Sequence, residues 1–160
     1  MRRIWIGLVL GMLVATGCDR GNHPENIGRP AAQFVVSDGT RTVDLSKLRG
    51  HVVVLNLWAT FCAPCIEELP SLLALQRQMP EVEVVAVSMD QDPDIYRRFL
   101  VEHHVDLLTV RDADQRVNAL YGTEQIPETY IIDKRGMLRR KFIGAQNWTS
   151  PEITNYLAKL

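Results

Sequence analysis

Several kinds of residue and motif are scarce in this chain, and their scarcity limits what it can do. The 160 residues include 18 basic and 19 acidic side chains, so there is no basic excess to neutralise nucleic-acid phosphates. We find no internal repeat, no low-complexity tract and no Gly-rich phosphate loop. The short basic cluster Arg139-Arg140-Lys141 is interpreted as the exposed side of a hairpin.

Cysteine is also scarce, with three residues, of which two form a single Cys-x-x-Cys pair, Cys62 and Cys65. A structural zinc site needs four ligands, and no second pair supplies the other two, so we expect no metal. The adjacent residues His103 and His104 are poorly placed to coordinate one metal ion, because neighbouring helical side chains point about 100° apart. We assign them a surface or helix-end role.

The third cysteine, Cys18, follows a segment typical of an export signal. Met1-Arg2-Arg3 is positively charged and 4–14 is apolar, too short to span a bilayer comfortably. Ala15-Thr16-Gly17-Cys18 resembles a bacterial lipobox, so we expect residues 1–17 to be a signal peptide and Cys18 to be lipidated. An ordinary secretory signal or an uncleaved anchor is the alternative.

The anchor would place the rest of the chain at a membrane. Asp19 resembles the signal that retains lipoproteins in the inner membrane, so we expect a lipid-anchored protein facing the periplasm or extracytoplasmic space. The polar, Gly- and Pro-containing segment 18–30 predicts a flexible tether. Residues 31–160 then form one domain, long enough for a proper core.

The Cys-x-x-Cys pair lies between an apolar run, 52–57, and a leucine-periodic segment. We predict a strand, a short loop and a helix with Cys62 at its N-terminus. The free amides and positive dipole end there favour a thiolate, so Cys62 is the expected attacking sulfur. Cys65, one turn deeper, is the expected resolving thiol.

Glu68 lies three residues after Cys65, so the two side chains share a helix face. If Glu68 is half buried beside the sulfur, desolvation raises its pKa and lets it exchange a proton with Cys65. The alternative is a solvated surface carboxylate, as we expect for Glu67. Pro64 suits the first turn of the helix, whereas Pro70 falls inside it.

Downstream, the hydrophobic pattern predicts alternating strands and helices. The predicted strands are 82–88, 106–110 and 138–143. The predicted helices begin after Asp92 and after Arg111, and the last runs from Thr149 to Leu160. Upstream, Ser37-Asp38-Gly39-Thr40 predicts a hairpin turn between short strands. Pro127 directly precedes a β-rich segment. From the residues alone it is equally an edge-strand starter or a cis-proline.

The run LNLWATFCAPCIEELP resembles the active-site signature of the thioredoxin superfamily, and within it the extracytoplasmic TlpA/ResA/CcmG (DsbE) group. The resemblance extends over about residues 29–160. Glu68 falls on the glutamate of that group, while Phe61 stands where Trp is most common. The resemblance implies an α/β, thioredoxin-like fold: a central mixed β-sheet flanked by helices, with an N-terminal β-hairpin extension.

The resemblance also implies site residues and partners. Pro127 matches the cis-proline that faces the dithiol, leaving Ile126 to pair with an extended substrate, and Phe61 and Pro64 are the expected further substrate contacts. We expect no cofactor beyond the redox-active disulfide. Proteins of this group act through membrane and client partners. They receive electrons from a membrane thiol reductase of the DsbD/CcdA type and reduce disulfides in client proteins, commonly apocytochrome c during cytochrome c biogenesis.

Three alternatives stay open. A thiol oxidant or isomerase would use the same pair, but Ala63-Pro64 supplies no charge or strong donor between the cysteines, which favours a reducing potential. A copper-delivery module for oxidase assembly would hold Cu(I) on Cys62 and Cys65, with or without a histidine, but Pro127 argues against metal access. A peroxiredoxin-like peroxidase is disfavoured, because its signature has a lone peroxidatic cysteine.

Overall fold

The structure is a computed structural model that describes residues 26–160. The expected signal peptide and the lipidation site Cys18 lie outside these residues. Within them, no helix combines the length and the apolar character needed to cross a bilayer.

A five-stranded mixed sheet forms the centre of the domain, with strand order β5-β4-β3-β6-β7. The strands β3, β4 and β5 are parallel, and β6 and β7 continue the sheet in antiparallel fashion. Their bounds are β3 Val52–Trp58, β4 Val82–Ser88, β5 Leu108–Arg111, β6 Glu128–Ile132 and β7 Leu138–Ile143. This arrangement confirms the expected thioredoxin-like fold.

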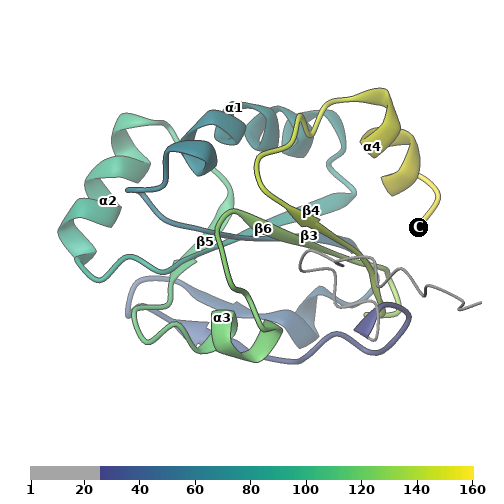
Figure 1. Ribbon diagram of the computed structural model, residues 1–160, viewed down its shortest axis with the longest axis horizontal. Coiled ribbons are helices and arrows are strands. Elements are labelled where there is room, and N and C mark those ends of the chain that lie inside the picture. The colour runs from purple at the N-terminus through teal and green to yellow at the C-terminus, as the bar shows by residue number, and fades with distance from the viewer. Residues whose placement is uncertain (1–25) are drawn as a thin grey trace, which may run out of the picture.

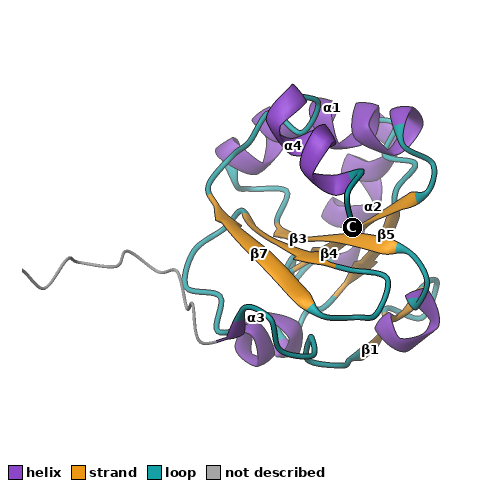
Figure 2. Ribbon diagram, turned by 90° about the vertical axis from the view of Figure 1, so that its right-hand side faces the viewer, coloured by secondary structure: helices purple, strands orange, loops and turns teal. Residues whose placement is uncertain are grey.

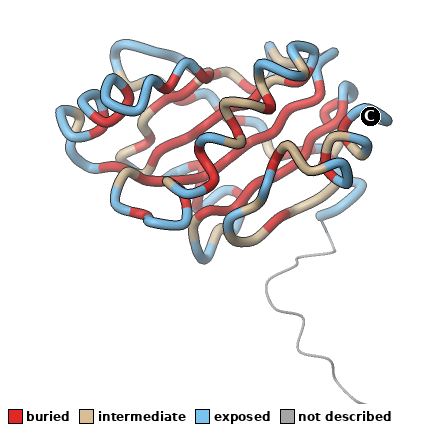
Figure 3. Tube along the Cα trace, turned by 90° about the horizontal axis from the view of Figure 1, so that it is seen from above, coloured by how far each residue is buried: buried red, intermediate tan, exposed pale blue. Residues whose placement is uncertain are grey.

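Helices cover both faces of the sheet (Figures 1 and 2). One face carries α1, α2 and α4, and the other carries α3 and the N-terminal hairpin. The helices are α1 Ala63–Gln78, α2 Pro93–Glu102, α3 Arg116–Tyr121 and α4 Pro151–Leu157. All seven residues of β3 are buried, because the strand lies between these two layers, and the buried trace runs along the sheet in Figure 3.

Alternation along β3 sends its side chains into two separate cores. Val52, Val54 and Trp58 join the core under α1, α2 and α4, whereas Val53, Leu55 and Leu57 join the core toward α3. Asn56 shares the α1 face, so a polar amide lies inside an otherwise apolar layer. That amide becomes part of the site described below.

The N-terminal hairpin consists of β1 Val35–Ser37 and β2 Thr42–Asp44, followed by a 3-10 turn, η2 Leu45–Leu48. Asp38 and Gly39, the latter with φ of +85°, make the expected turn between the strands. Part of the expected tether is described as well: Gly28 and Arg29 exchange backbone hydrogen bonds with Leu138 at 2.7 and 2.9 Å.

Some expected boundaries shift. β5 begins at Leu108 rather than two residues earlier, and α3 begins only at Arg116, after Gln115 in the left-handed region. Residues 112–115 connect β5 to α3, and the Asp112 carboxylate accepts a hydrogen bond from the Val117 amide. The last helix ends at Leu157, short of the expected Leu160.

The prediction for the basic cluster is wrong at Lys141. Its ammonium group is 3.0 Å from Oε2 of Glu128, and the two side chains are 6% and 1% exposed. Because β6 and β7 pair Glu128 with Ile143 and Tyr130 with Lys141, Lys141 lies on the same face of the sheet as Glu128 and diagonally across from it. Arg139 does lie on the exposed side of the hairpin.

Candidate active site

The site is built where β3 ends and α1 begins. Cys62 is the N-cap residue of α1, and its sulfur accepts a hydrogen bond from the amide of Cys65 at 3.3 Å. The two cysteines form a disulfide, with Cα atoms 5.3 Å apart. A sulfur at this position faces the free amides of the first helical turn, which stabilise negative charge when the disulfide is reduced.

The surroundings of the two sulfurs differ. Cys62 is 8% exposed and Cys65 is 3% exposed, and Phe61 and Pro64 beside them are exposed, Phe61 to 71%. An apolar surface therefore adjoins the more accessible sulfur. This placement is consistent with the predicted attack by Cys62 and resolution by Cys65. It is also consistent with the predicted substrate contacts of Phe61 and Pro64. Both stay predictions.

The second predicted landmark lies at the same edge of the sheet. The Ile126–Pro127 peptide bond is cis, as expected from the resemblance. Leu57 pairs with Glu128, so Pro127 lies beside the end of β3, from which the chain leads to Cys62. Ile126 packs against the core cluster that contains both cysteines, and among the described residues it makes no backbone–backbone hydrogen bond. Its role in binding a client strand stays a prediction.

Glu68 is more deeply buried than expected, at 2% exposure. Its Oε1 accepts a hydrogen bond from the Asn56 amide at 2.8 Å, and its Oε2 accepts two, from the backbone N–H of Gln146 and from Nε1 of Trp148, both at 3.0 Å. Asn56 in turn donates to the hydroxyl of Thr129 at 2.9 Å. The solvated-surface alternative for Glu68 is therefore excluded, whereas Glu67 is exposed.

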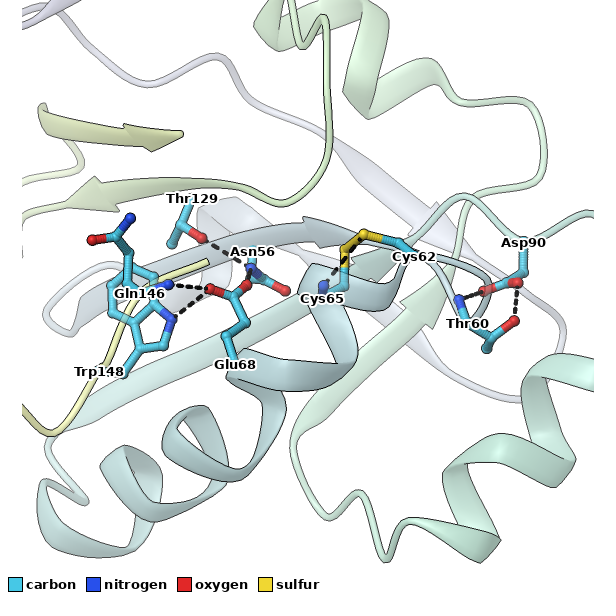
Figure 4. The surroundings of a disulfide bond; sticks show 9 residues. All are labelled: Asn56, Thr60, Cys62, Cys65, Glu68, Asp90, Thr129, Gln146 and Trp148. Atoms are coloured by element: carbon cyan, nitrogen blue, oxygen red, sulfur yellow. Dashed lines mark hydrogen bonds between the residues drawn. A yellow bond between two sulfur atoms is a disulfide. The ribbon is translucent and has the colours of Figure 1, made fainter. Parts of the chain in front are cut away.

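Burial raises the pKa of Glu68 above its ordinary value of 4.5, and the hydrogen bonds from Trp148, Gln146 and Asn56 oppose that rise. Glu68 lies one turn along α1 from Cys65, but Figure 4 shows its carboxylate turned toward Gln146 and Trp148 rather than toward the disulfide. Glu68 is thus a buried carboxylate with a raised pKa, one turn after Cys65 on α1.

A second buried carboxylate fixes the loop before Cys62. Asp90, which follows β4, accepts hydrogen bonds from the Thr60 amide at 3.0 Å and the Thr60 hydroxyl at 2.5 Å (Figure 4). Ser88 donates its hydroxyl to the same carboxylate at 2.5 Å. Sequence reasoning missed this contact. The signal was present, because the polar residues after β3 and after β4 must lie at one edge of a parallel sheet.

Glu128 was also missed as a member of the site region. It follows Pro127 directly and faces the α3 side of the sheet, where it accepts a hydrogen bond from the Tyr130 hydroxyl at 2.7 Å and forms an ion pair with Lys141. Burial raises the pKa of Tyr130 above its usual range, so that its hydroxyl remains a donor. Two buried carboxylates, Glu68 and Glu128, thus lie on opposite faces of the sheet near the end of β3.

The two adjacent histidines lie at the C-terminal end of α2. His103 caps the end of α2 and stacks on Phe99 with ring centroids 4.0 Å apart, and His104 follows it with φ of +51°. Across residues 26–160, no group of three or more His, Cys, Asp or Glu side chains is arranged to hold a metal ion.

A thioredoxin-like sheet with a Cys-x-x-Cys disulfide at the head of α1 defines a thiol–disulfide oxidoreductase, and the comparisons specify the family. The AhpC/TSA family matches residues 27–141. ResA of Bacillus thuringiensis, a thiol–disulfide oxidoreductase, is 31% identical over 99% of this chain and 94% of its own length. The thiol:disulfide interchange protein DsbE of Pseudomonas aeruginosa is 34% identical over 74% of this chain and 67% of its own.

Solved structures agree with these relatives. A crystal structure from Chlorobium tepidum, assigned as a thiol:disulfide interchange protein DsbE, superposes with a TM-score of 0.77 at 25% identity, covering 83% of this chain and 96% of the other. The chain therefore belongs to the AhpC/TSA family, in its TlpA/ResA/CcmG-like group of thiol–disulfide oxidoreductases.

Proposed function

We propose that this chain is a membrane-tethered reductase that works on the outer side of the cytoplasmic membrane. It reduces disulfides in client proteins, with the haem-attachment cysteines of apocytochrome c as the first candidate client. A membrane thiol reductase of the DsbD/CcdA type restores its dithiol. The observation that carries the chemistry is the position of Cys62, whose sulfur caps α1 and accepts the Cys65 amide.

The proposed cycle balances as a dithiol–disulfide exchange. The Cys62 thiolate attacks one sulfur of the client disulfide, and the other client sulfur leaves as a thiolate, giving a mixed disulfide. The Cys65 thiolate then attacks the Cys62 sulfur, which releases the second client thiolate and forms the Cys62–Cys65 disulfide. Two electrons pass to the client, and its two thiolates take up the protons that Cys62 and Cys65 gave up.

We assign Glu68 to the second step of this cycle. The Cys65 thiol must lose its proton before it can attack, and Glu68 is the buried carboxylate one turn away on the same helix. Because burial raises its pKa, Glu68 exchanges protons in a pH range closer to the thiol's than an exposed glutamate does. We infer that it takes the Cys65 proton as Cys65 attacks and passes it on as the client thiolate leaves, and that it returns a proton to Cys65 when the dithiol is regenerated.

The decisive experiment is trapping. Cys65→Ser, expressed in the native host, should accumulate mixed disulfides through Cys62 that disappear on reduction, and mass spectrometry identifies the clients. Cys62→Ser is the matched control and should trap none. Equal trapping by the two variants would contradict the assignment of the attacking sulfur.

The direction of transfer needs a separate measurement. Equilibration of the Cys62–Cys65 pair with thiol buffers should give a potential near that of thioredoxin, about −270 mV. A value near that of DsbA, about −120 mV, would make the protein an oxidant. Stoichiometric Cu(I) binding by the reduced domain would favour the copper-delivery alternative.

The membrane anchor is tested at Cys18. If Cys18 is lipidated, the native protein should partition with membranes and incorporate labelled fatty acid. Cys18→Ser should abolish the label and release the protein into the soluble extracytoplasmic fraction. Unchanged partitioning of Cys18→Ser would point to an uncleaved anchor instead.

A further inference from the structure

The loop between β7 and α4 supplies most of the hydrogen bonds that hold Glu68. Two of the three donors to its carboxylate come from this loop, the backbone N–H of Gln146 and the indole N–H of Trp148, both directed at Oε2 (Figure 4). They lie 78 and 80 residues from Glu68 in the sequence. A distant part of the chain therefore fixes the carboxylate of a residue that lies one turn after Cys65 on α1.

Trp148 is held so that its N–H cannot easily turn elsewhere. Its side chain is fully buried, and its ring packs edge-on against Phe142 with centroids 5.3 Å apart. Its backbone N–H donates to the hydroxyl of Ser71 at 3.2 Å, and Ser71 also donates to the carbonyl of Glu68 at 2.8 Å. Trp148 is thus joined to α1 by two hydrogen bonds, one from its indole N–H and one from its backbone N–H.

The groups that face Glu68 from the surrounding elements are neutral. They are Asn56 of β3, Gln146 and Trp148 of the loop, and Ser71 of α1. Among the described residues, no ion pair includes Glu68, and the titratable groups nearest along the same helix are the two cysteines and exposed Glu67. Its ionised form is therefore stabilised by neutral donors alone, of which Trp148 opposes the effect of burial most strongly.

We propose that Trp148 is a positioning residue for the thiol–disulfide reaction: its indole N–H holds the Glu68 carboxylate and thereby sets the pH dependence of the Cys65 step. This inference rests on the proposed proton exchange between Glu68 and Cys65. A residue that only fills the core would owe its effect to the shape of its ring. A positioning residue would owe its effect to the N–H. Variants that change the ring and the N–H independently distinguish these two roles.

The test compares variants that remove the N–H with one that disturbs only the packing. Trp148→Phe keeps an aromatic ring without the donor, and Trp148→3-benzothienylalanine keeps the indole shape with sulfur in place of N–H. Phe142→Leu removes the ring against which Trp148 packs but leaves the donor. The readout is the pH dependence of oxidation of the reduced protein by oxidised glutathione, in single turnover.

Losing a donor to a carboxylate destabilises its ionised form, so the inflection that depends on Glu68 should move upward by about one pH unit in both Trp148 variants. Phe142→Leu should leave the inflection in place even though it lowers stability. Trp148 variants with the native inflection, or an equal shift in Phe142→Leu, would overturn the proposal. The benzothienyl variant keeps the test decisive if Trp148→Phe fails to fold.

A second readout separates this inference from the proposed role of Glu68. Carbon-13 NMR of the Glu68 carboxyl carbon follows its protonation without any catalytic step, in the oxidised protein. An upward shift of this titration in the Trp148 variants shows that the N–H controls the protonation of Glu68. If Glu68→Gln nevertheless leaves the glutathione profile unchanged, the catalytic role of Glu68 is rejected, and with it the effect of Trp148 on the Cys65 step. An unshifted carboxyl titration rejects the inference itself.

Discussion

Asp90 accepts hydrogen bonds from both the backbone N–H and the hydroxyl of Thr60, the residue two positions before Cys62. The contact joins the loop after β3 to the loop after β4, and Met89 reinforces it by donating its N–H to the Trp58 carbonyl at 3.0 Å. The loop that presents Cys62 is therefore attached to the sheet edge by a buried carboxylate. Its position does not depend on the disulfide alone.

Removing this carboxylate should loosen the loop. Asp90→Ala leaves the Thr60 amide and the Ser88 hydroxyl without their acceptor, so we expect the free energy of unfolding to fall by about 2–3 kcal/mol. Thr60→Val, which loses only the hydroxyl donor, should cost about 1 kcal/mol. Denaturant unfolding of the reduced proteins measures both. A loss in Thr60→Val as large as in Asp90→Ala would argue against a shared role of the carboxylate.

Glu68 should make stability depend on pH with a defined sign. Its folded-state pKa is raised by burial, so the folded protein binds the proton more tightly than the unfolded chain does. The stabilisation is fully present below the ordinary value of 4.5 and is lost as the pH rises through the folded-state pKa. The oxidised wild type should therefore lose stability with rising pH in this window relative to Glu68→Gln.

Urea unfolding of the oxidised proteins at a series of pH values measures this difference. Glu67→Gln is the matched control, because Glu67 is exposed one position away on the same helix. Its curve should run parallel to that of the wild type. A wild-type curve that rises relative to Glu68→Gln across this window would mean that the hydrogen bonds outweigh the burial.

The buried ion pair between Glu128 and Lys141 gives a third prediction. Lys141→Met leaves the Glu128 carboxylate buried with no cation, and breaking a buried pair in this way typically costs about 3–5 kcal/mol. Adding Glu128→Gln should recover much of that loss, because the uncompensated charge is removed. Thermal unfolding of the wild type, both single variants and the double variant completes the cycle. Strictly additive losses would show that the two side chains are not coupled.

The sequence predicted the fold and the dithiol well, for local reasons. Hydrophobic patterning and capping residues placed β4, β6, β7 and the start of α2, and the Cys-x-x-Cys motif with its flanking strand and helix identified Cys62 and Cys65. These signals lie within a few residues of the features they predict. The resemblance to a known family then decided between the two interpretations of Pro127, which its own neighbours left open.

The environments of the carboxylates could not be predicted in the same way. Glu68 is held by Trp148, which is 80 residues away, and Lys141 is buried because strand pairing brings it to Glu128. Such contacts depend on which elements become neighbours and in which register. A basic triplet such as 139–141 looks solvated until the pairing of β6 and β7 is known.

The exposed ring of Phe61 gives the last prediction. At 71% exposure it buries little surface within the domain, so Phe61→Ala should change the free energy of unfolding by no more than about 0.5 kcal/mol. If the ring contacts clients, the same variant should lower kcat/KM for a protein disulfide several-fold and leave the rate with oxidised glutathione nearly unchanged, because so small a disulfide needs little apolar contact beyond the sulfur. Phe61→Trp should retain the native rate with both substrates.

An equal loss with the two substrates would mean that Phe61 acts on the Cys62 sulfur itself. Unchanged rates with both substrates would place client recognition elsewhere on this edge of the sheet.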